Sequence, residues 1–87
     1  MLTNVYAFYD EKAEVHLTPF FMQNDVSAIR AFQQLLMDKN TQLGKYPNDF
    51  KLYRLGVFND NNGHIESLTF PEMLIQGTNL LEFGNVS

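Results

Sequence analysis

The sequence contains no cysteine and no tryptophan, and it has few cations. Without cysteine there is no disulfide scaffold, no thiolate zinc or iron–sulfur site and no cysteine nucleophile. Six basic residues stand against ten acidic ones, and the net charge of −4 argues against a protein that coats nucleic acid by bulk positive charge. No apolar run approaches the roughly 18 residues that a membrane-spanning helix needs. The N-terminus also lacks the pattern of a signal peptide, so we expect a cytoplasmic protein without membrane contact.

What the chain does have is an apolar and aromatic composition. Its 87 residues are 45% hydrophobic, which is typical of a packed globular domain. Eight phenylalanines and four tyrosines give an aromatic content of 14%, and this richness needs an explanation in so small a chain. We expect one domain over residues 1–87, with a patterned part at 1–70 and a C-terminal segment or arm at 71–87.

The N-terminal part predicts two strands. Residues 2–9 mix β-branched and aromatic side chains, which suit a pleated surface. The polar residues 10–12 form a turn, and residues 15–22 return as a second strand of a hairpin. Pro19 has no N–H to donate, so we expect that stretch at a sheet edge or at a bulge.

An amphipathic helix is predicted after this hairpin. Asn24 or Asp25 can cap its N-terminus, and the pattern ends near residues 38–40. Its apolar stripe consists of Ile29, Phe32 and Leu36.

The remaining pattern contains a loop and a second hairpin. Residues 41–49 predict a loop, and residues 50–58 and 64–70 predict strands joined by the Asn- and Gly-rich turn 59–63. The segment after residue 70 is predicted less clearly, as a fifth strand, a short helix or an arm. The order strand–strand–helix–strand–strand predicts an α+β fold, with a small antiparallel sheet packed by one amphipathic helix.

Catalytic and metal chemistry has little support in the sequence. His16 and His64 have no second ligand at helical spacing. The turn that ends at Gly63 resembles a calcium loop only superficially, because Phe58 would stand where the first oxygen ligand is needed. There is no glycine elbow around a serine and no phosphate-binding glycine motif. We therefore expect a protein without cofactor, metal or enzymatic activity.

The distribution of charge gives the one positive indication of function. Residues 39–54 have a balance of +3, whereas residues 1–38 sum to −3 and residues 55–87 to −4. Cations interleaved with aromatic side chains are typical of a groove for single-stranded nucleic acid, where cations follow phosphates and rings stack on bases. The candidate binding residues are Lys39, Lys45, Tyr46, Lys51, Tyr53 and Arg54. The alternative interpretation is a solvated basic surface over core aromatics, or an interface such as that of a symmetric homodimer.

Several segments resemble a known family. They are VYAFYD (5–10), KA (12–13), PF (19–20), ND (24–25), AIRAF (28–32), PNDF (47–50), LY (52–53), LG (55–56) and FND (58–60) with Gly63. Together they cover residues 1–70 and resemble the small nonstructural protein, called VP5 or the ORF5 protein, of gokushovirus-like microviruses. These phages have circular single-stranded DNA genomes. The resemblance implies a DNA-binding protein of the infected bacterial cytoplasm that acts in the switch to single-strand synthesis or in packaging.

A second function class stays open beside DNA binding. The chain would then be a protein–protein adaptor for the phage replication or capsid proteins, or for a host factor. It would act by adding a strand at a sheet edge.

Overall fold

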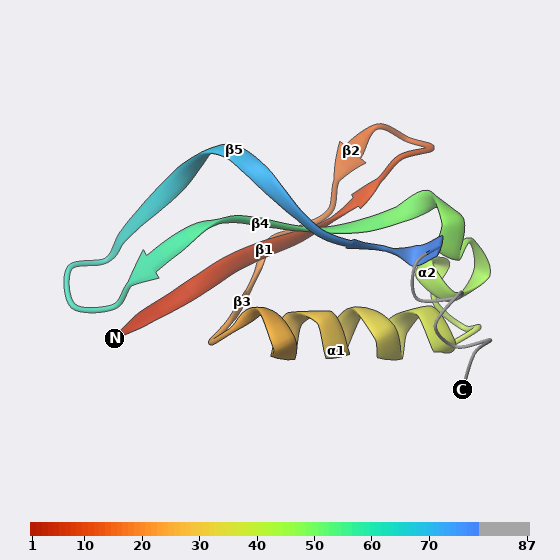
Figure 1. The fold of residues 1–87 in the computed structure, drawn as a ribbon, viewed down its shortest axis with the longest axis horizontal. Helices are drawn as coiled ribbons and strands as arrows, with labels where there is room; N and C mark the ends of the chain where they lie inside the picture. Colours follow the sequence, from red (N-terminus) through yellow and green to blue (C-terminus); the bar gives the residue numbers. More distant parts are fainter. Residues whose placement is uncertain (79–87) are drawn as a thin grey trace.

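The computed structural model describes residues 1–78, which form an antiparallel sheet with one long helix on one face (Figure 1). This arrangement confirms the predicted α+β fold. The main elements in chain order are β1 (Leu2–Asp10), β2 (Val15–His16), β3 (Phe20–Met22), α1 (Asp25–Met37), β4 (Phe50–Asn59) and β5 (His64–Gln76).

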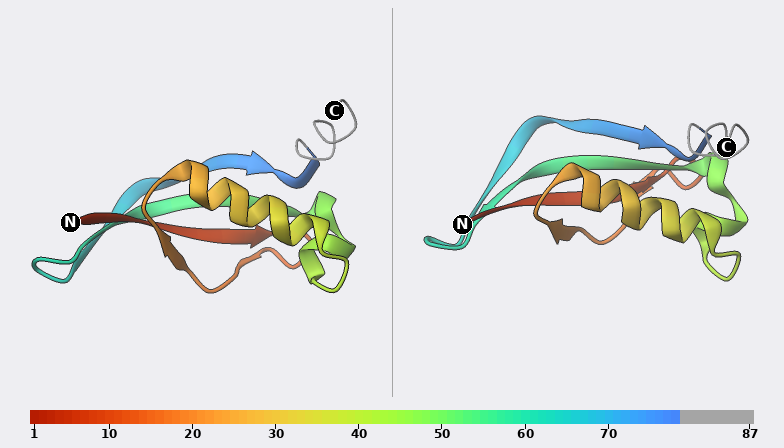
Figure 2. Two further views of the ribbon diagram at one scale, coloured as in Figure 1. Left: turned by 90° about the horizontal axis from the view of Figure 1, so that it is seen from below. Right: turned by 60° about the horizontal axis from the view of Figure 1, so that its bottom comes forward.

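The first strand lies in the middle of the sheet. The strand order is β2-β1-β4-β5, and β3 also pairs with β1. β1 is antiparallel to β4 along its whole length, so β2 and β3 share its other edge. Figure 2 shows α1 crossing in front of this sheet, with β5 and the β2–β3 segment on opposite sides. The sheet therefore has one face toward α1 and one face away from it.

The predicted second strand is divided in two. Its pairing with β1 continues as far as Leu17, whose N–H donates to the carbonyl of Phe8 at 2.8 Å. β3 then resumes at Phe20. Pro19 lies in the gap and has no N–H for a ladder, which explains the interruption. The predicted position of this stretch at a sheet edge is confirmed.

The second hairpin is longer than predicted. Gly56 pairs with Ser67 and Arg54 with Glu72, so residues 68–71 bulge out opposite Leu55 alone. Because this stretch is outside the regular ladder, Pro71 is tolerated and β5 continues to Gln76. The start of the C-terminal segment is thus a continuation of the fourth predicted strand, and residues 79–87 lie outside the described part of the chain.

The helix α1 begins and packs as the sequence predicts. The side-chain oxygen of Asn24 accepts a hydrogen bond from the Ser27 N–H at 2.8 Å. Phe32 and Leu36 are buried, and Ile29 packs at the margin. The buried cluster beneath the sheet consists of Tyr6, Ala28, Phe32, Leu36, Leu43, Phe50 and Leu52.

The predicted loop after α1 contains two short helices, α2 (Gln42–Lys45) and the 3₁₀ helix η1 (Pro47–Asp49). The Thr41 hydroxyl oxygen caps α2 by accepting from the Gly44 N–H at 3.0 Å. Gly44 lies so close to the end of α1 that a Cβ atom there would be 1.9 Å from the Asp38 carbonyl oxygen. Glycine is therefore required at this approach, which holds α2 against the end of α1.

Candidate nucleic-acid interface

The structure places the six predicted binding residues in three separate environments. Lys39, Lys45 and Tyr46 lie around α2, at one end of the molecule. Lys51 and Tyr53 pair with Tyr9 and Ala7 on the face of the sheet away from α1. Arg54 points to the other face. The six residues therefore do not form one continuous surface.

Arg54 is held by acidic side chains from two other elements. Its guanidinium donates to Asp25 Oδ2 at 2.9 Å and forms a second ion pair with Glu72. Burial lowers the pKa of Arg54, but these two carboxylates outweigh burial and raise it overall. A DNA phosphate at Arg54 would have to compete with both carboxylates.

The same acidic side chain of Asp25 also binds the core tyrosine. The Tyr6 hydroxyl donates to Asp25 Oδ1 at 2.7 Å and accepts from the Asn4 amide at 3.0 Å. Burial and the hydrogen bond to Asp25 raise the pKa of Tyr6 from 10.0 to about 12. Arg54 and Tyr6 thus belong to a polar network that joins β1, β4 and β5 to the start of α1.

Tyr53 belongs to an aromatic cluster that the sequence did not reveal. Its ring centroid lies 5.9 Å from that of Tyr9 and 5.8 Å from that of His16, and Tyr9 and His16 are 4.7 Å apart. Lys51, next to Tyr9 in the register, has its ammonium 3.5 Å from the Glu11 carboxylate. The signal for this cluster was the hairpin register, which sets Tyr9 opposite His16.

The residues around α2 are more accessible. Tyr46 is 56% exposed. Within residues 1–78, Lys39 and Lys45 form no salt bridge, and the same holds for Lys12 on the β1–β2 turn. An exposed ring beside cations without carboxylate partners therefore marks this end of the molecule.

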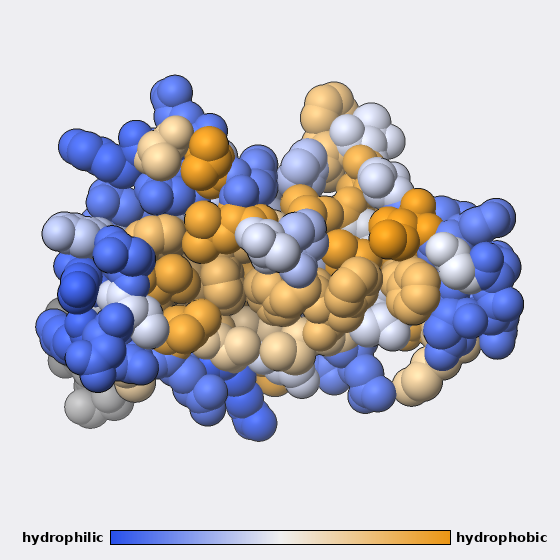
Figure 3. Space-filling model, turned by 180° about the vertical axis from the view of Figure 1, so that it is seen from behind, coloured by the Kyte–Doolittle hydropathy of each residue, from blue (hydrophilic) through white to orange (hydrophobic). Residues whose placement is uncertain are grey.

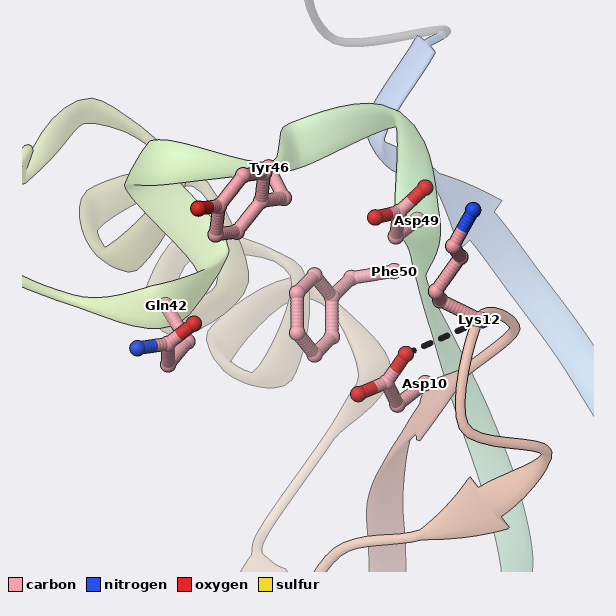
Figure 4. Close-up of a pocket in the computed structure, with 6 residues that line it drawn as sticks. All are labelled: Asp10, Lys12, Gln42, Tyr46, Asp49 and Phe50. Atoms are coloured by element: carbon pink, nitrogen blue, oxygen red, sulfur yellow. Dashed lines mark hydrogen bonds between the residues drawn. The ribbon is translucent and has the colours of Figure 1, made fainter.

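A cavity of about 400 Å³ opens at this end, between the β1–β2 turn and α2. Figure 4 shows the Phe50 ring between Gln42 and Tyr46 on one side and the carboxylates of Asp10 and Asp49 on the other. Phe50 is 4% exposed and forms an apolar floor. The lining residues are Asp10, Lys12, Gln42, Tyr46, Asp49 and Phe50.

An apolar band crosses the side of the molecule where β2 and β3 form the sheet edge (Figure 3). The exposed apolar side chains of this edge include Val15, Leu17 and Phe21. Phe21 makes an edge contact with Phe58, with 5.7 Å between ring centroids. The register position of Phe58 opposite Thr3 places its side chain on the face of the sheet away from α1.

Residues 1–78 contain neither a cluster of metal ligands nor a membrane-spanning helix. No group of three or more histidine, cysteine, aspartate or glutamate side chains in this part of the chain is arranged to hold a metal ion. None of its helices is long and apolar enough to cross a membrane.

The fold and the site define a small α+β protein with an aromatic sheet face and an exposed aromatic and basic end. Comparison with family models identifies its family. The model of the Phage ORF5 protein family matches residues 3–80, which is most of the chain, and the chain belongs to this family. No curated protein and no solved structure matches it. The chain is therefore an ORF5-type bacteriophage protein.

Proposed function

We propose that this phage accessory protein binds single-stranded DNA without catalysing a reaction. The observation that carries the proposal is the exposed ring of Tyr46 at the same end of the molecule as Lys45 and Lys39, which have no carboxylate partners among residues 1–78. Stacking on an aromatic ring stabilises a bound base by roughly 1–3 kcal/mol, so a few such contacts suffice for a protein of low charge. The cations then contact phosphates on either side of the stacked base.

The aromatic sheet face is a second contact surface, separate from the one at Tyr46. Lys51 is the second residue of β4, and Tyr53 and Tyr9 lie next to it on the face away from α1. Open sheet faces with aromatic side chains stack bases in several single-strand-binding folds. The ion pair of Lys51 with the exposed Glu11 is weak, typically about 1 kcal/mol or less, so a phosphate can replace Glu11.

The biological role that we propose follows the resemblance to gokushovirus-like microviruses. Their circular single-stranded genome is the natural ligand for such a surface. The protein would act in the infected bacterial cytoplasm, in the switch to single-strand synthesis or in packaging. Membership of the Phage ORF5 protein family supports the phage setting of this proposal.

Fluorescence anisotropy with a labelled single strand, measured at several salt concentrations, tests the proposal. The double variant Lys39→Ala/Lys45→Ala loses two phosphate contacts, so the slope of log K against log salt should fall by about 1.4. Tyr46→Ala should weaken binding at every salt concentration. Arg30→Ala is the matched control, because Arg30 is an exposed cation of α1 outside this end. Binding that does not depend on salt, or an equal loss in Arg30→Ala, would refute the proposal.

A second candidate function is favoured by the exposed edge formed by β2 and β3. Phe21 on this edge is 49% exposed, and a partner strand can pair where β3 ends. The protein would then be an adaptor for phage replication or capsid proteins or a host factor, or would pair with itself as a homodimer. An adaptor should bind with little salt dependence and keep its partners after nuclease treatment, whereas light scattering reports a homodimer directly.

A further inference from the structure

We propose that the cavity between the β1–β2 turn and α2 receives a single unstacked nucleobase and prefers guanine. This inference rests on the proposed binding of single-stranded DNA and adds a base preference to it. The cavity volume of about 400 Å³ lies within the range of small-ligand pockets, which is roughly 300–1,000 Å³.

The aromatic side chains make the cavity suitable for the flat face of a base. Phe50 supplies a buried floor, and Tyr46 stands beside it and is 56% exposed. Unstacked bases in protein complexes are held in this way, with a ring against an aromatic side chain and the base edge hydrogen-bonded. The strand can reach the cavity because Tyr46 is also part of the proposed stacking surface.

The charge inside the cavity selects a base edge over a phosphate. Asp10 and Asp49 contribute two carboxylates and Lys12 one ammonium, so the lining is net negative. A phosphate is repelled from such a lining. Lys39 and Lys45, the proposed phosphate contacts, lie between α1 and α2 and at the end of α2, and they do not line the cavity. This arrangement separates phosphate binding from base binding at the same end of the molecule.

The carboxylates also distinguish between the bases. An ionised carboxylate only accepts hydrogen bonds, so it favours a base edge with adjacent donors. Guanine presents its N1–H and N2 amino group side by side, and its O6 and N7 can accept from the Gln42 amide. Thymine presents one N–H between two carbonyl oxygens, which a carboxylate repels. Cytosine and adenine present an amino group beside an acceptor nitrogen and fall between these extremes.

Of the two carboxylates, Asp49 is the one available to a ligand. Asp10 Oδ1 already accepts from the backbone N–H groups of Lys12 at 3.0 Å and Ala13 at 3.2 Å. Within residues 1–78 the Asp49 side chain accepts no hydrogen bond, and it belongs to η1 directly before the floor residue Phe50. Asp49 is therefore the guanine-recognising residue in this proposal.

The test uses an oligothymidine of about twelve nucleotides with one central position varied. A central guanine should bind about fivefold more tightly than a central thymine, which is the lower end of the discrimination given by a bidentate contact. A central hypoxanthine, which lacks the N2 amino group, should bind the unaltered protein only slightly more tightly than a central thymine. Asp49→Asn should abolish the guanine preference and still bind oligothymidine. Glu66→Gln, which removes the same charge from β5, should keep the preference.

The outcomes separate this inference from the proposed function. Equal affinity for all central bases, with salt-dependent binding of oligothymidine retained, overturns the base pocket and leaves DNA binding in place. A guanine preference that survives in Asp49→Asn, or that hypoxanthine fully reproduces, also overturns it. Failure of every oligonucleotide to bind overturns both proposals.

Discussion

Replacing Tyr6 by phenylalanine isolates the network that joins the sheet to the start of α1. The ring remains, so the packing of this fully buried side chain is kept. The hydrogen bond from the Tyr6 hydroxyl to Asp25, 2.7 Å long, is lost together with the acceptor for Asn4. A hydrogen bond to a charged group contributes about 1.5–3 kcal/mol. About a third of the Asp25 side chain is exposed, and Arg54 still neutralises it. We therefore expect Tyr6→Phe to lower the free energy of unfolding by the smaller of these values, about 1.5 kcal/mol.

The effect of Tyr6→Phe should depend on pH in a defined direction. The pKa of Tyr6 is about 12 in the folded protein, against 10.0 as its ordinary value. Between these values the unfolded chain loses the phenolic proton and the folded chain keeps it, so stability falls as the pH rises. The free energy of unfolding of the wild type falls by about 2–3 kcal/mol over this pH range. The wild type should therefore be more stable than Tyr6→Phe at pH 8. The two proteins should become equally stable near pH 11, about one unit above the ordinary pKa of tyrosine.

Urea denaturation followed by circular dichroism, at intervals from pH 8 to pH 11.5, measures both effects. At pH 8 the variant should also melt roughly 6–12 °C lower, as expected for about 1.5 kcal/mol in a domain of this size. Parallel pH dependences in the two proteins would refute the proton linkage. An unchanged stability at pH 8 would refute the contribution of the Tyr6–Asp25 hydrogen bond.

Two further predictions concern packing. Phe32→Ala removes a fully buried ring between α1 and the sheet, so the free energy of unfolding measured with urea should fall by about 3–5 kcal/mol. The control Gln34→Ala, on the exposed face of α1, should change this free energy by less than about 0.5 kcal/mol. Gly44→Ala places a methyl group against the Asp38 carbonyl oxygen and should lower the free energy of unfolding by about 1–3 kcal/mol. Gly63→Ala should lower it by less, because a Cβ there meets open space and only the positive φ of 75° is unfavourable.

The elements that the sequence predicts well are those with a local signal. The cap at Asn24 and the stripe with Phe32 and Leu36 define α1 because both signals lie within the helix itself. The short helix α2 has only one local signal, the cap at Thr41, since four residues are too few for a periodic pattern. The sequence predicts an end of β5 at Phe70, before Pro71, because the bulge opposite Leu55 that tolerates the proline depends on the register with β4.

The candidate site was predictable in composition but not in arrangement. The window that contains Tyr46 and Lys45 is visible in the sequence, and their exposure agrees with a surface role. The ion pairs of Arg54 could not be predicted, because Asp25 and Glu72 approach it from distant parts of the chain. For the same reason the cavity, which joins Asp10 to η1, has no signature in any one segment.

The central position of β1 also has a consequence for the order in which the protein folds. The hairpin partners on one edge of β1 follow it closely in the chain, but β4 follows only after α1, α2 and η1. The N–H and C=O groups of β1 that face β4 therefore remain without their native partners until most of the chain has been synthesised. Closing this long loop carries an entropic cost before the sheet is complete. We expect formation of the β1–β4 ladder to limit the folding rate, and mutations at this ladder to slow folding more than mutations at the β2–β3 edge.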